Sequence, residues 1–150
     1  MTAPGDRPPR RGWRRVFEPG ELRAALDAFR YLARARILHA RFPASRLIER
    51  LRAPADGPRP ARLDADSRER MRRALMAVSR RMPWRSDCMI QSLAARMWLD
   101  RLGVPCAFRL GAAGGPEGIA AHAWIEVDGH VVTGGRAVGR MAAFMETNGG

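Results

Sequence analysis

Two stretches of the sequence carry side chains that can act together in nucleophilic chemistry. The first, WRSDCMIQSLAARMWLDRLG (residues 84–103), predicts an amphipathic helix that begins near Asp87 and carries Cys88 in its first turn. Unpaired N–H groups and the positive end of the helix dipole stabilise a thiolate at such a position. The second, AAHAWIEVDGHVVTGG (residues 120–135), places His122 on a predicted strand. We therefore predict Cys88 as a nucleophile and His122 as its general base and acid.

Cys88 and His122 could instead have purely structural roles. Such roles suit the remaining cysteine and histidines of the chain better. Cysteine is often a small buried apolar residue, and a strand histidine is often hydrogen-bonded within a core. Cys106 lies within an apolar run, so we expect it in the core. His39 lies among arginines, and His130 follows a turn glycine and should face solvent. A cysteine at a helix start followed by a histidine on a strand, as in papain-like and transglutaminase-like sites, favours catalysis by Cys88 and His122.

A third group should hold the imidazole in one tautomer. If Asp128-Gly129 forms a two-residue type I′ turn, strand pairing brings His122 opposite Gly135. No carboxylate stands near position 134, and Asp128 lies about 20 Å from His122 at about 3.3 Å per residue. This leaves the hydroxyl of Thr133, or a backbone carbonyl, to orient the ring.

Three further side chains are weaker candidates for substrate binding. Trp84 and Gln91 flank Cys88, although packing and a polar helix surface explain them as well. Trp124 shares the face of His122 and is either a wall of the cleft or a core residue. The glycine-rich stretch GAAGGPEG (111–118) predicts a loop that could close over a substrate as a lid. It lacks the lysine of a phosphate-binding loop, so we do not expect it to bind a nucleotide.

The helices that precede this region follow from apolar spacing and from helix-breaking residues. We expect a first helix from about Pro19 to Arg41, a short helix over ASRLIERL, and a third helix capped by Asp64 or Asp66. In the first helix, three- and four-residue steps predict an apolar face formed by Leu22, Leu26, Phe29, Ala33, Ile37 and Ala40. The arginines between them predict a basic face formed by Arg23, Arg30, Arg34, Arg36 and Arg41.

The C-terminal part of the chain predicts a small antiparallel sheet, with strands over residues 104–110, 119–127 and 130–133. Helices followed by such a sheet predict the α+β class, with the helix of Cys88 packed on the strands. Composition further predicts a flexible basic N-terminus (1–17), a helical region with a linker (18–60) and a catalytic core (61–150).

The chain is strongly basic. Its 27 basic residues are all arginine and stand against 15 acidic residues, for a formal net charge of +12. This balance favours an anionic partner, whether nucleic acid, acidic lipid or an acidic protein surface, unless a GC-rich genome explains it. The start of the chain has no apolar signal region, so we expect a cytoplasmic protein with both cysteines as thiols. We expect no metal and no cofactor, because the cysteines and histidines lack the spacing of a zinc site.

The stretch DCMIQSLAARMWLDRLGVPCAFRLGAAGGPEGIAAHAWIEVDGHVV resembles the B proteins of lasso-peptide biosynthesis, which are transglutaminase-like cysteine peptidases. The matching features are Cys88 followed by Ser92-Leu93, the helix exit RLGVP, and the block AHAWIEVDG. The arginine- and leucine-rich helices upstream also resemble the family, so the resemblance covers roughly residues 20–135. It implies a transglutaminase-like or papain-like core, with Cys88 as the nucleophile and His122 as the base.

The resemblance also implies a substrate and partners. Family members remove the leader from a ribosomally made precursor, and a separate ATP-dependent ligase then closes the macrolactam. At 150 residues the chain resembles the split form, which relies on a separate leader-binding protein rather than a leader-recognition domain of its own. The family has an aspartate about where Gly134 stands, so this sequence departs from the pattern at the third catalytic position.

Two other functions remain open from the sequence. One is a transglutaminase-like amide hydrolase or acyl transferase that acts on an unrelated substrate. The other is a non-enzymatic basic adaptor whose arginine-rich first helix holds nucleic acid or an acidic partner. The sequence lacks the base-stacking aromatic residues and the motifs of nucleic-acid binders, so we expect this helix to bind partner proteins or an acidic leader.

Overall fold

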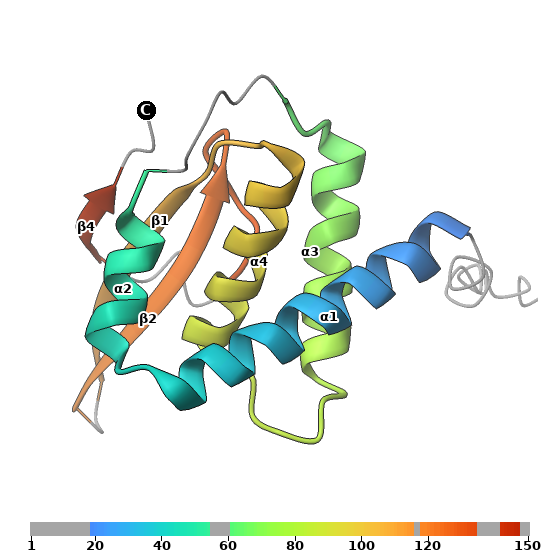
Figure 1. Cartoon of the computed structure of the whole chain (residues 1–150). Helices are drawn as coiled ribbons and strands as arrows, with labels where there is room; N and C mark the ends of the chain where they lie inside the picture. Colours follow the sequence, from blue (N-terminus) through green and yellow to red (C-terminus); the bar gives the residue numbers. More distant parts are fainter. Residues whose placement is uncertain (1–18, 55–60, 116–117, 135–141, 148–150) are drawn as a thin grey trace, which may run out of the picture.

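The computed structural model describes residues 19–54, 61–115, 118–134 and 142–147 (Figure 1). The N-terminal segment that was predicted to be flexible lies outside these residues. So does the segment around residue 60, where composition predicted a domain boundary. Among the described helices, none has both the length and the apolar character that a membrane crossing needs.

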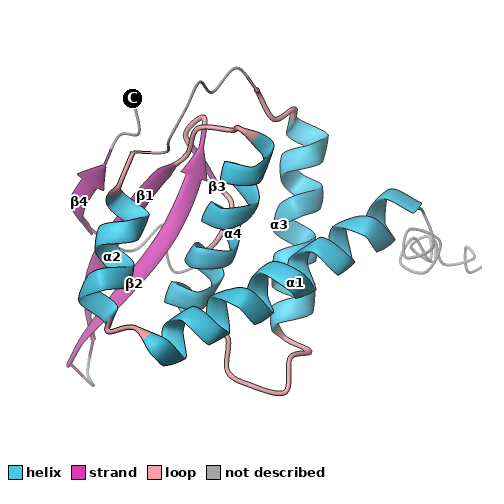
Figure 2. Ribbon diagram, in the orientation of Figure 1, coloured by secondary structure: helices cyan, strands magenta, loops and turns pink. Residues whose placement is uncertain are grey.

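Four helices form where the apolar spacing and the helix-breaking residues predicted them. They are α1 (Pro19–Arg41), α2 (Ala44–Arg52), α3 (Ala65–Ser79) and α4 (Cys88–Leu102). In Figure 1, α1 crosses in front of α3 and α4, and it packs against both. Figure 2 shows the helices grouped on one side of the sheet, with α4 against β2.

Short-range hydrogen bonds fix the ends of α3 and α4. Asp64 caps α3, because its side chain accepts a hydrogen bond of 2.9 Å from the N–H of Ser67. Asp87 caps α4 in the same way through the N–H of Ile90, at 3.0 Å. At the other end of α4, Gly103 has a φ of 68°, the left-handed conformation that glycine adopts with little strain. The predicted start and stop of the cysteine-bearing helix are therefore confirmed.

Within the described residues, the sheet has four antiparallel strands in the order β3-β2-β1-β4. Their bounds are Ala107–Gly115 (β1), Gly118–Val127 (β2), His130–Val131 (β3) and Ala142–Thr147 (β4). The sequence predicted the first three, although β3 is shorter than expected. It did not predict β4, which pairs with β1 from a distant part of the chain.

The turn between β2 and β3 has the predicted type. Asp128 and Gly129 both have positive φ, at 50° and 75°, as a type I′ turn requires. Val127 pairs with His130, which sets the register of the hairpin as expected.

The predicted substrate lid is wrong. Gly111–Gly115 continue β1, and Gly111 pairs with His122 in a regular antiparallel ladder with β2. Small residues do not prevent extended pairing, and the ladder satisfies backbone groups that a loop would leave to water. Composition alone therefore misread this segment.

The face of α1 that enters the core is also different from the predicted one. The buried residues are small residues and one leucine: Ala24, Ala28, Leu32 and Ala35. The larger apolar residues of the predicted face are exposed: Leu22 by 59%, Leu26 by 57%, Phe29 by 50% and Ile37 by 54%. Both sets follow helical spacing, and small side chains let α1 approach the helices that it crosses more closely. We call the exposed set, Leu22, Leu26, Phe29 and Ile37, the apolar stripe of α1.

A buried arginine attaches α2 to α4. Arg96 is only 7% exposed. Its guanidinium donates to the carbonyls of Leu51 and Ala53 at 2.8 and 2.7 Å, and it pairs with Asp100 at 2.9 Å. These carbonyls belong to the C-terminal end of α2, where helix carbonyls have no partner within the helix. Arg96 therefore caps α2 from the neighbouring helix.

Arg96→Leu should lower the free energy of unfolding by about 2–4 kcal/mol, because it leaves the carbonyls of Leu51 and Ala53 without their donor. Urea unfolding followed by circular dichroism measures the change. Arg101→Leu, at an exposed position on the same helix, is the matched control and should change stability little. Equal losses in the two variants would contradict a capping role for Arg96.

Candidate active site

The structure places Cys88 as the first residue of α4, half-buried against the hydrophobic core. In the first turn, the side chain of Asp87 accepts from Ile90 N–H and its carbonyl accepts from Gln91 N–H, both at 3.0 Å. Within the described residues, the N–H groups of Cys88 and Met89 have no hydrogen-bond partner. The helix start therefore offers two backbone donors beside the sulfur, as an oxyanion requires.

The second cysteine lies elsewhere and has a different environment. Cys106 is 6% exposed and belongs to the hydrophobic core, as the sequence predicted. It forms no disulfide with Cys88, and both cysteines remain thiols. Only Cys88 therefore combines a helix N-terminus with partial exposure.

His122 lies on β2, and its ring is held by a backbone carbonyl. Its Nε2 lies 2.8 Å from the carbonyl oxygen of Gly134. A carbonyl only accepts, so Nε2 carries the proton and Nδ1 is the basic nitrogen of the neutral ring. The ring of Trp124 stacks against the imidazole, with centroids 6.2 Å apart and an interplanar angle of 23°.

The face of β2 that carries His122 is not the face that packs on the helices. Alternate residues of a strand point to opposite faces. The residues in the hydrophobic core are Ala123, Ile125 and Val127. His122, Trp124 and Glu126 therefore share the other face. The indole N–H of Trp124 donates to Glu126 at 2.8 Å, and the ring is 3% exposed. Trp124 thus stacks against the imidazole on this face of the sheet. Because it is almost fully buried, it contributes little to the wall of an open cleft.

Ser92 and Thr133 connect the helix of Cys88 to the edge of β2. Both are buried, with their hydroxyl oxygens 3.5 Å apart. The Thr133 hydroxyl also accepts a hydrogen bond of 3.0 Å from the N–H of Ile125. Ser92 lies one helical turn after Cys88, on the same face of α4. From the sequence, Ser92 has no predicted role beyond its place in the family motif, because only the fold brings it to Thr133.

The sequence left two groups that could orient His122, the Thr133 hydroxyl or a backbone carbonyl. In the structure, the carbonyl of Gly134 is hydrogen-bonded to the ring. The Thr133 hydroxyl is bonded to Ile125 and Ser92, and within the described residues it makes no hydrogen bond to the ring. Thr133 therefore affects His122 only through the backbone, because its side-chain contacts anchor the chain immediately before Gly134.

Sulfur and imidazole approach from different sides of β2. Within the described part of the chain, no hydrogen bond joins the Cys88 sulfur to the His122 ring. In Figure 1, α4 and β2 run in the same direction, so the start of α4 and the first half of β2 lie toward one end of the molecule. Both elements therefore reach one end of the molecule, but the described contacts do not join the two side chains.

Two of the three weaker candidates, Trp84 and Gln91, flank the start of α4 in the sequence. The side-chain amide of Gln91 donates to the carbonyl of Ser86 at 2.9 Å, so it holds the segment before Cys88. The indole nitrogen of Trp84 and the hydroxyl of Ser86 are buried without a partner within the described residues. Buried polar atoms are normally paired, so these two have unused hydrogen-bonding capacity in the segment before Cys88.

A second histidine reaches this helix end, which the sequence did not predict. Nε2 of His39, near the end of α1, lies 3.9 Å from a carboxylate oxygen of Asp87. When protonated, His39 offsets the negative charge beside Cys88. No local sequence signal indicates this contact, because it depends on how α1 crosses α4.

Comparison with protein families shows which family the chain belongs to. The family described as the transglutaminase-like superfamily matches residues 29–147, a range that contains Cys88, His122 and Gly134. The chain belongs to the transglutaminase-like superfamily. Members are generally cysteine-dependent hydrolases or transferases, and the predicted α+β, transglutaminase-like fold is confirmed. Comparison with curated proteins and with solved structures found no significant match.

Thr133→Val should lower the free energy of unfolding by about 1–3 kcal/mol, because the buried N–H of Ile125 loses its acceptor while the side-chain shape is kept. Urea unfolding measures the loss. Thr133→Ser keeps the hydroxyl and is the matched control, which should lose less. If Ser and Val are equally destabilising, the methyl group rather than the hydroxyl holds this segment.

Proposed function

We propose that this member of the transglutaminase-like superfamily is a cysteine peptidase that removes the leader from a lasso-peptide precursor. The observation that carries the proposal is a half-buried cysteine at the N-terminus of α4, with two unused backbone donors beside it. The family match and the hydrogen-bonded histidine on β2 support the same chemistry. The lasso-peptide substrate rests on the resemblance around Cys88 and in the AHAWIEVDG block.

The proposed reaction requires the imidazole of His122 to reach the sulfur of Cys88, a contact that the described residues do not make. Nδ1 of His122 takes the thiol proton as the sulfur of Cys88 attacks the carbonyl carbon at the leader–core junction. The resulting oxyanion accepts hydrogen bonds from the N–H groups of Cys88 and Met89. The intermediate collapses, the core leaves as an amine with a proton from His122, and the leader remains as a thioester on the sulfur. Water, deprotonated by His122, then hydrolyses the thioester to a free carboxylate and restores the thiol.

A second function of the same class differs only in the acceptor. A transglutaminase-like acyl transferase forms the same thioester, but an amine rather than water resolves it. Incubation of a candidate precursor with this protein and its partners, followed by mass spectrometry, separates the two. Hydrolysis yields a leader with a free carboxylate, whereas transfer yields a leader joined to the amine.

The apolar stripe of α1 supports a role for a partner protein. Arg30 and Arg34 are exposed on the same helix and line a pocket of about 650 Å³ with Tyr31 and Trp98. Apolar side chains beside exposed arginines fit a partner with an apolar groove and an acidic rim. A second copy of this chain fits less well, because its net charge of +12 opposes self-association. We propose that the separate leader-binding protein docks on α1, with the macrolactam-forming ligase in the same pathway.

Cys88→Ala should abolish leader cleavage, because no other residue supplies a thiolate at the helix start. Cleavage of a precursor peptide, followed by mass spectrometry, measures this loss. Cys106→Ala is the matched control: it should retain cleavage while losing about 1 kcal/mol of stability from the core. Retained cleavage in Cys88→Ala would remove the peptidase function.

Reversing the charge of both Arg30 and Arg34 to Glu should weaken the complex with the leader-binding protein about tenfold. Isothermal titration calorimetry measures the affinity. The control reverses only Arg50, an exposed arginine on α2, and should bind as the wild type does. Equal binding by the double variant and the Arg50 variant would place the partner elsewhere.

A further inference from the structure

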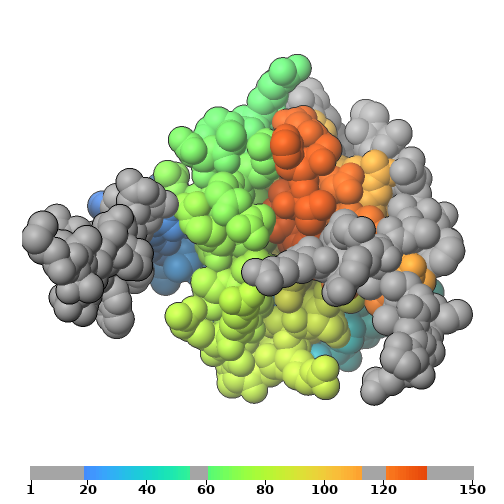
Figure 3. All heavy atoms as spheres, turned by 180° about the vertical axis from the view of Figure 1, so that it is seen from behind, coloured from blue at the N-terminus to red at the C-terminus, as the bar shows by residue number. Residues whose placement is uncertain are grey.

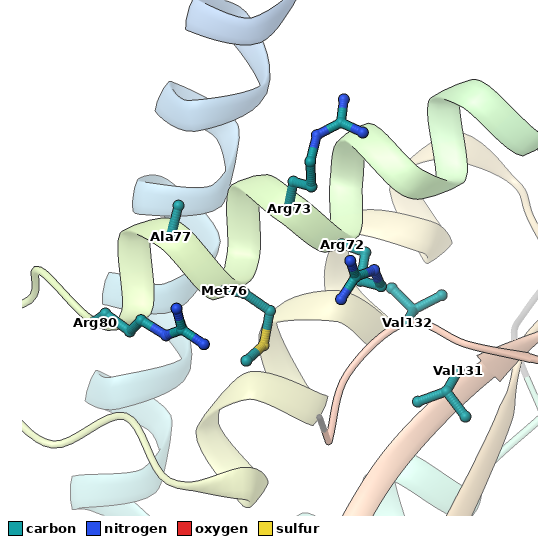
Figure 4. Close-up of a pocket in the computed structure, with 7 residues that line it drawn as sticks. All are labelled: Arg72, Arg73, Met76, Ala77, Arg80, Val131 and Val132. Carbon is teal, nitrogen blue, oxygen red and sulfur yellow. The ribbon is translucent and has the colours of Figure 1, made fainter. Parts of the chain in front are cut away.

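A pocket of about 920 Å³ lies between α3 and the hairpin of β2 and β3. Its lining residues are Arg72, Arg73, Met76, Ala77, Arg80, Val131 and Val132 (Figure 4). Figure 3 shows the surface of α3, in green, meeting the orange surface of residues 121–134 on this side of the molecule. We call this pocket the α3–β3 groove. The site described above does not use it.

One face of α3 supplies two guanidinium groups with a thioether between them. Arg72, Met76 and Arg80 follow one another at four-residue steps, so they lie along one side of the helix. In Figure 4 they point to the side where Val131 and Val132 lie, whereas Arg73 and Ala77 point away. Arg73 instead donates to Glu21 of α1 at 2.8 Å.

The two arginines of this face differ in how their charge is balanced. Arg72 donates to both carboxylate oxygens of Glu69, at 2.7 and 2.8 Å. This hydrogen bond lowers the pKa of Glu69, so the carboxylate stays charged and offsets Arg72. Arg80 is exposed and makes no ion pair within the described residues. The face therefore carries a positive charge at Arg80 that the described part of the protein leaves uncompensated.

The opposite wall of the groove is a sheet edge. β3 is the outer strand of the sheet, and Val131 pairs with Glu126. On either side of this pair, Val127 pairs with His130, and Val132 N–H donates to the carbonyl of Ile125 at 2.8 Å. Antiparallel pairs alternate between bonded and non-bonded, so the N–H and C=O of Val131 point outward, away from β2. An extended peptide can pair with this edge.

We propose that the α3–β3 groove binds an extended acidic peptide, with main-chain hydrogen bonds to Val131 and two carboxylates on Arg72 and Arg80. The eight residues from Arg72 to Arg80 span about 12 Å of helix. Residues i and i+4 of an extended strand are about 13 Å apart and point the same way. Residue i+2 then lies over Met76. The groove therefore selects the order acid–x–apolar–x–acid.

The inference rests on the proposed function in one respect: the bound peptide is a segment of the leader only if the protein is the leader peptidase. The residues that line the groove are linked along the chain to both parts of the candidate active site. Arg80 leads through residues 81–87 to Cys88, and Val132 continues into Thr133 and Gly134. In Figure 1, the C-terminal end of α3 and the start of α4 lie toward the same end of the molecule. A peptide in the groove therefore enters the region of the thiol.

Binding can be measured without cleavage in the Cys88→Ala protein. The probe is a fluorescein-labelled Ser-Glu-Thr-Leu-Thr-Glu-Ser peptide, followed by fluorescence anisotropy. Replacing both Glu residues by Gln should weaken binding about tenfold, as loss of two exposed ion pairs implies. Arg80→Glu should weaken binding of the Glu peptide and remove its advantage over the Gln peptide. Arg50→Glu on α2 is the matched control and should leave both affinities unchanged.

Two further variants separate recognition from misfolding. Glu69→Gln removes the carboxylate that competes for Arg72, so binding of the Glu peptide should strengthen several-fold. Val131→Pro removes only the outward N–H, which an edge strand tolerates, and should weaken both peptides. Val131→Ala keeps that N–H and should bind both peptides as the parent protein does. Circular dichroism of each variant checks the fold.

Equal affinity for the Glu and Gln peptides, or Arg80→Glu binding like the parent protein, would overturn the inference. A single-stranded oligonucleotide could also displace the peptide. If Arg80→Glu weakened binding of the oligonucleotide as much as binding of the peptide, the groove would be a nucleic-acid site and the inference would be overturned. These results are independent of the proposed function. Cleavage by the Cys88→Ala protein would reject the peptidase and leave the binding data standing, whereas failed binding beside intact wild-type cleavage would reject only the groove.

Discussion

The candidate site depends on one buried contact, the attachment of Thr133 to both α4 and β2. Its hydroxyl accepts from the N–H of Ile125 and lies against the hydroxyl of Ser92. A side-chain oxygen here takes the place of a main-chain acceptor, so the ladder of β2 and β3 stops after Val132 and the chain turns. The turn brings the carbonyl of Gly134 to the ring of His122. Because Ser92 is one turn from Cys88, the same contact ties the helix of the thiol to the segment that holds the imidazole.

Gly134 also shows what a carbonyl can and cannot do in place of the aspartate that the family resemblance leads one to expect. Its φ of 105° is accessible to glycine but strained for other residues, and it directs the carbonyl toward Nε2. The carbonyl fixes the tautomer, which is one role of the third catalytic group. It offers only a partial negative charge to the imidazolium that forms during catalysis, which is the other role. The stacked ring of Trp124 and its bond to Glu126 add rigidity but no direct charge contact with His122.

The parts of the fold that the sequence predicted are those controlled by neighbouring residues. Asp87 and Gly103 mark the ends of α4, and Asp128-Gly129 fixes the hairpin, because caps and tight turns depend on a few adjacent backbone groups. The face of α1 was predicted wrongly because two faces have helical spacing, and packing against α3 and α4 decides between them. β4, the contact of His39 with Asp87, and the attachment of Thr133 to Ser92 join segments far apart in the chain, which periodicity does not record.

The arginines show why a net charge alone assigns no function. Arg96 is buried and uses its planar guanidinium to reach two carbonyls of α2 and a carboxylate of α4 at once. A lysine ammonium is a point charge and would not match this fork of acceptors, so the choice of arginine matters here. Arg73 joins α3 to α1 through Glu21, and Arg72 is balanced by Glu69. Part of the positive charge therefore holds the helices together. What remains available to partners is carried by exposed groups such as Arg30, Arg34 and Arg80.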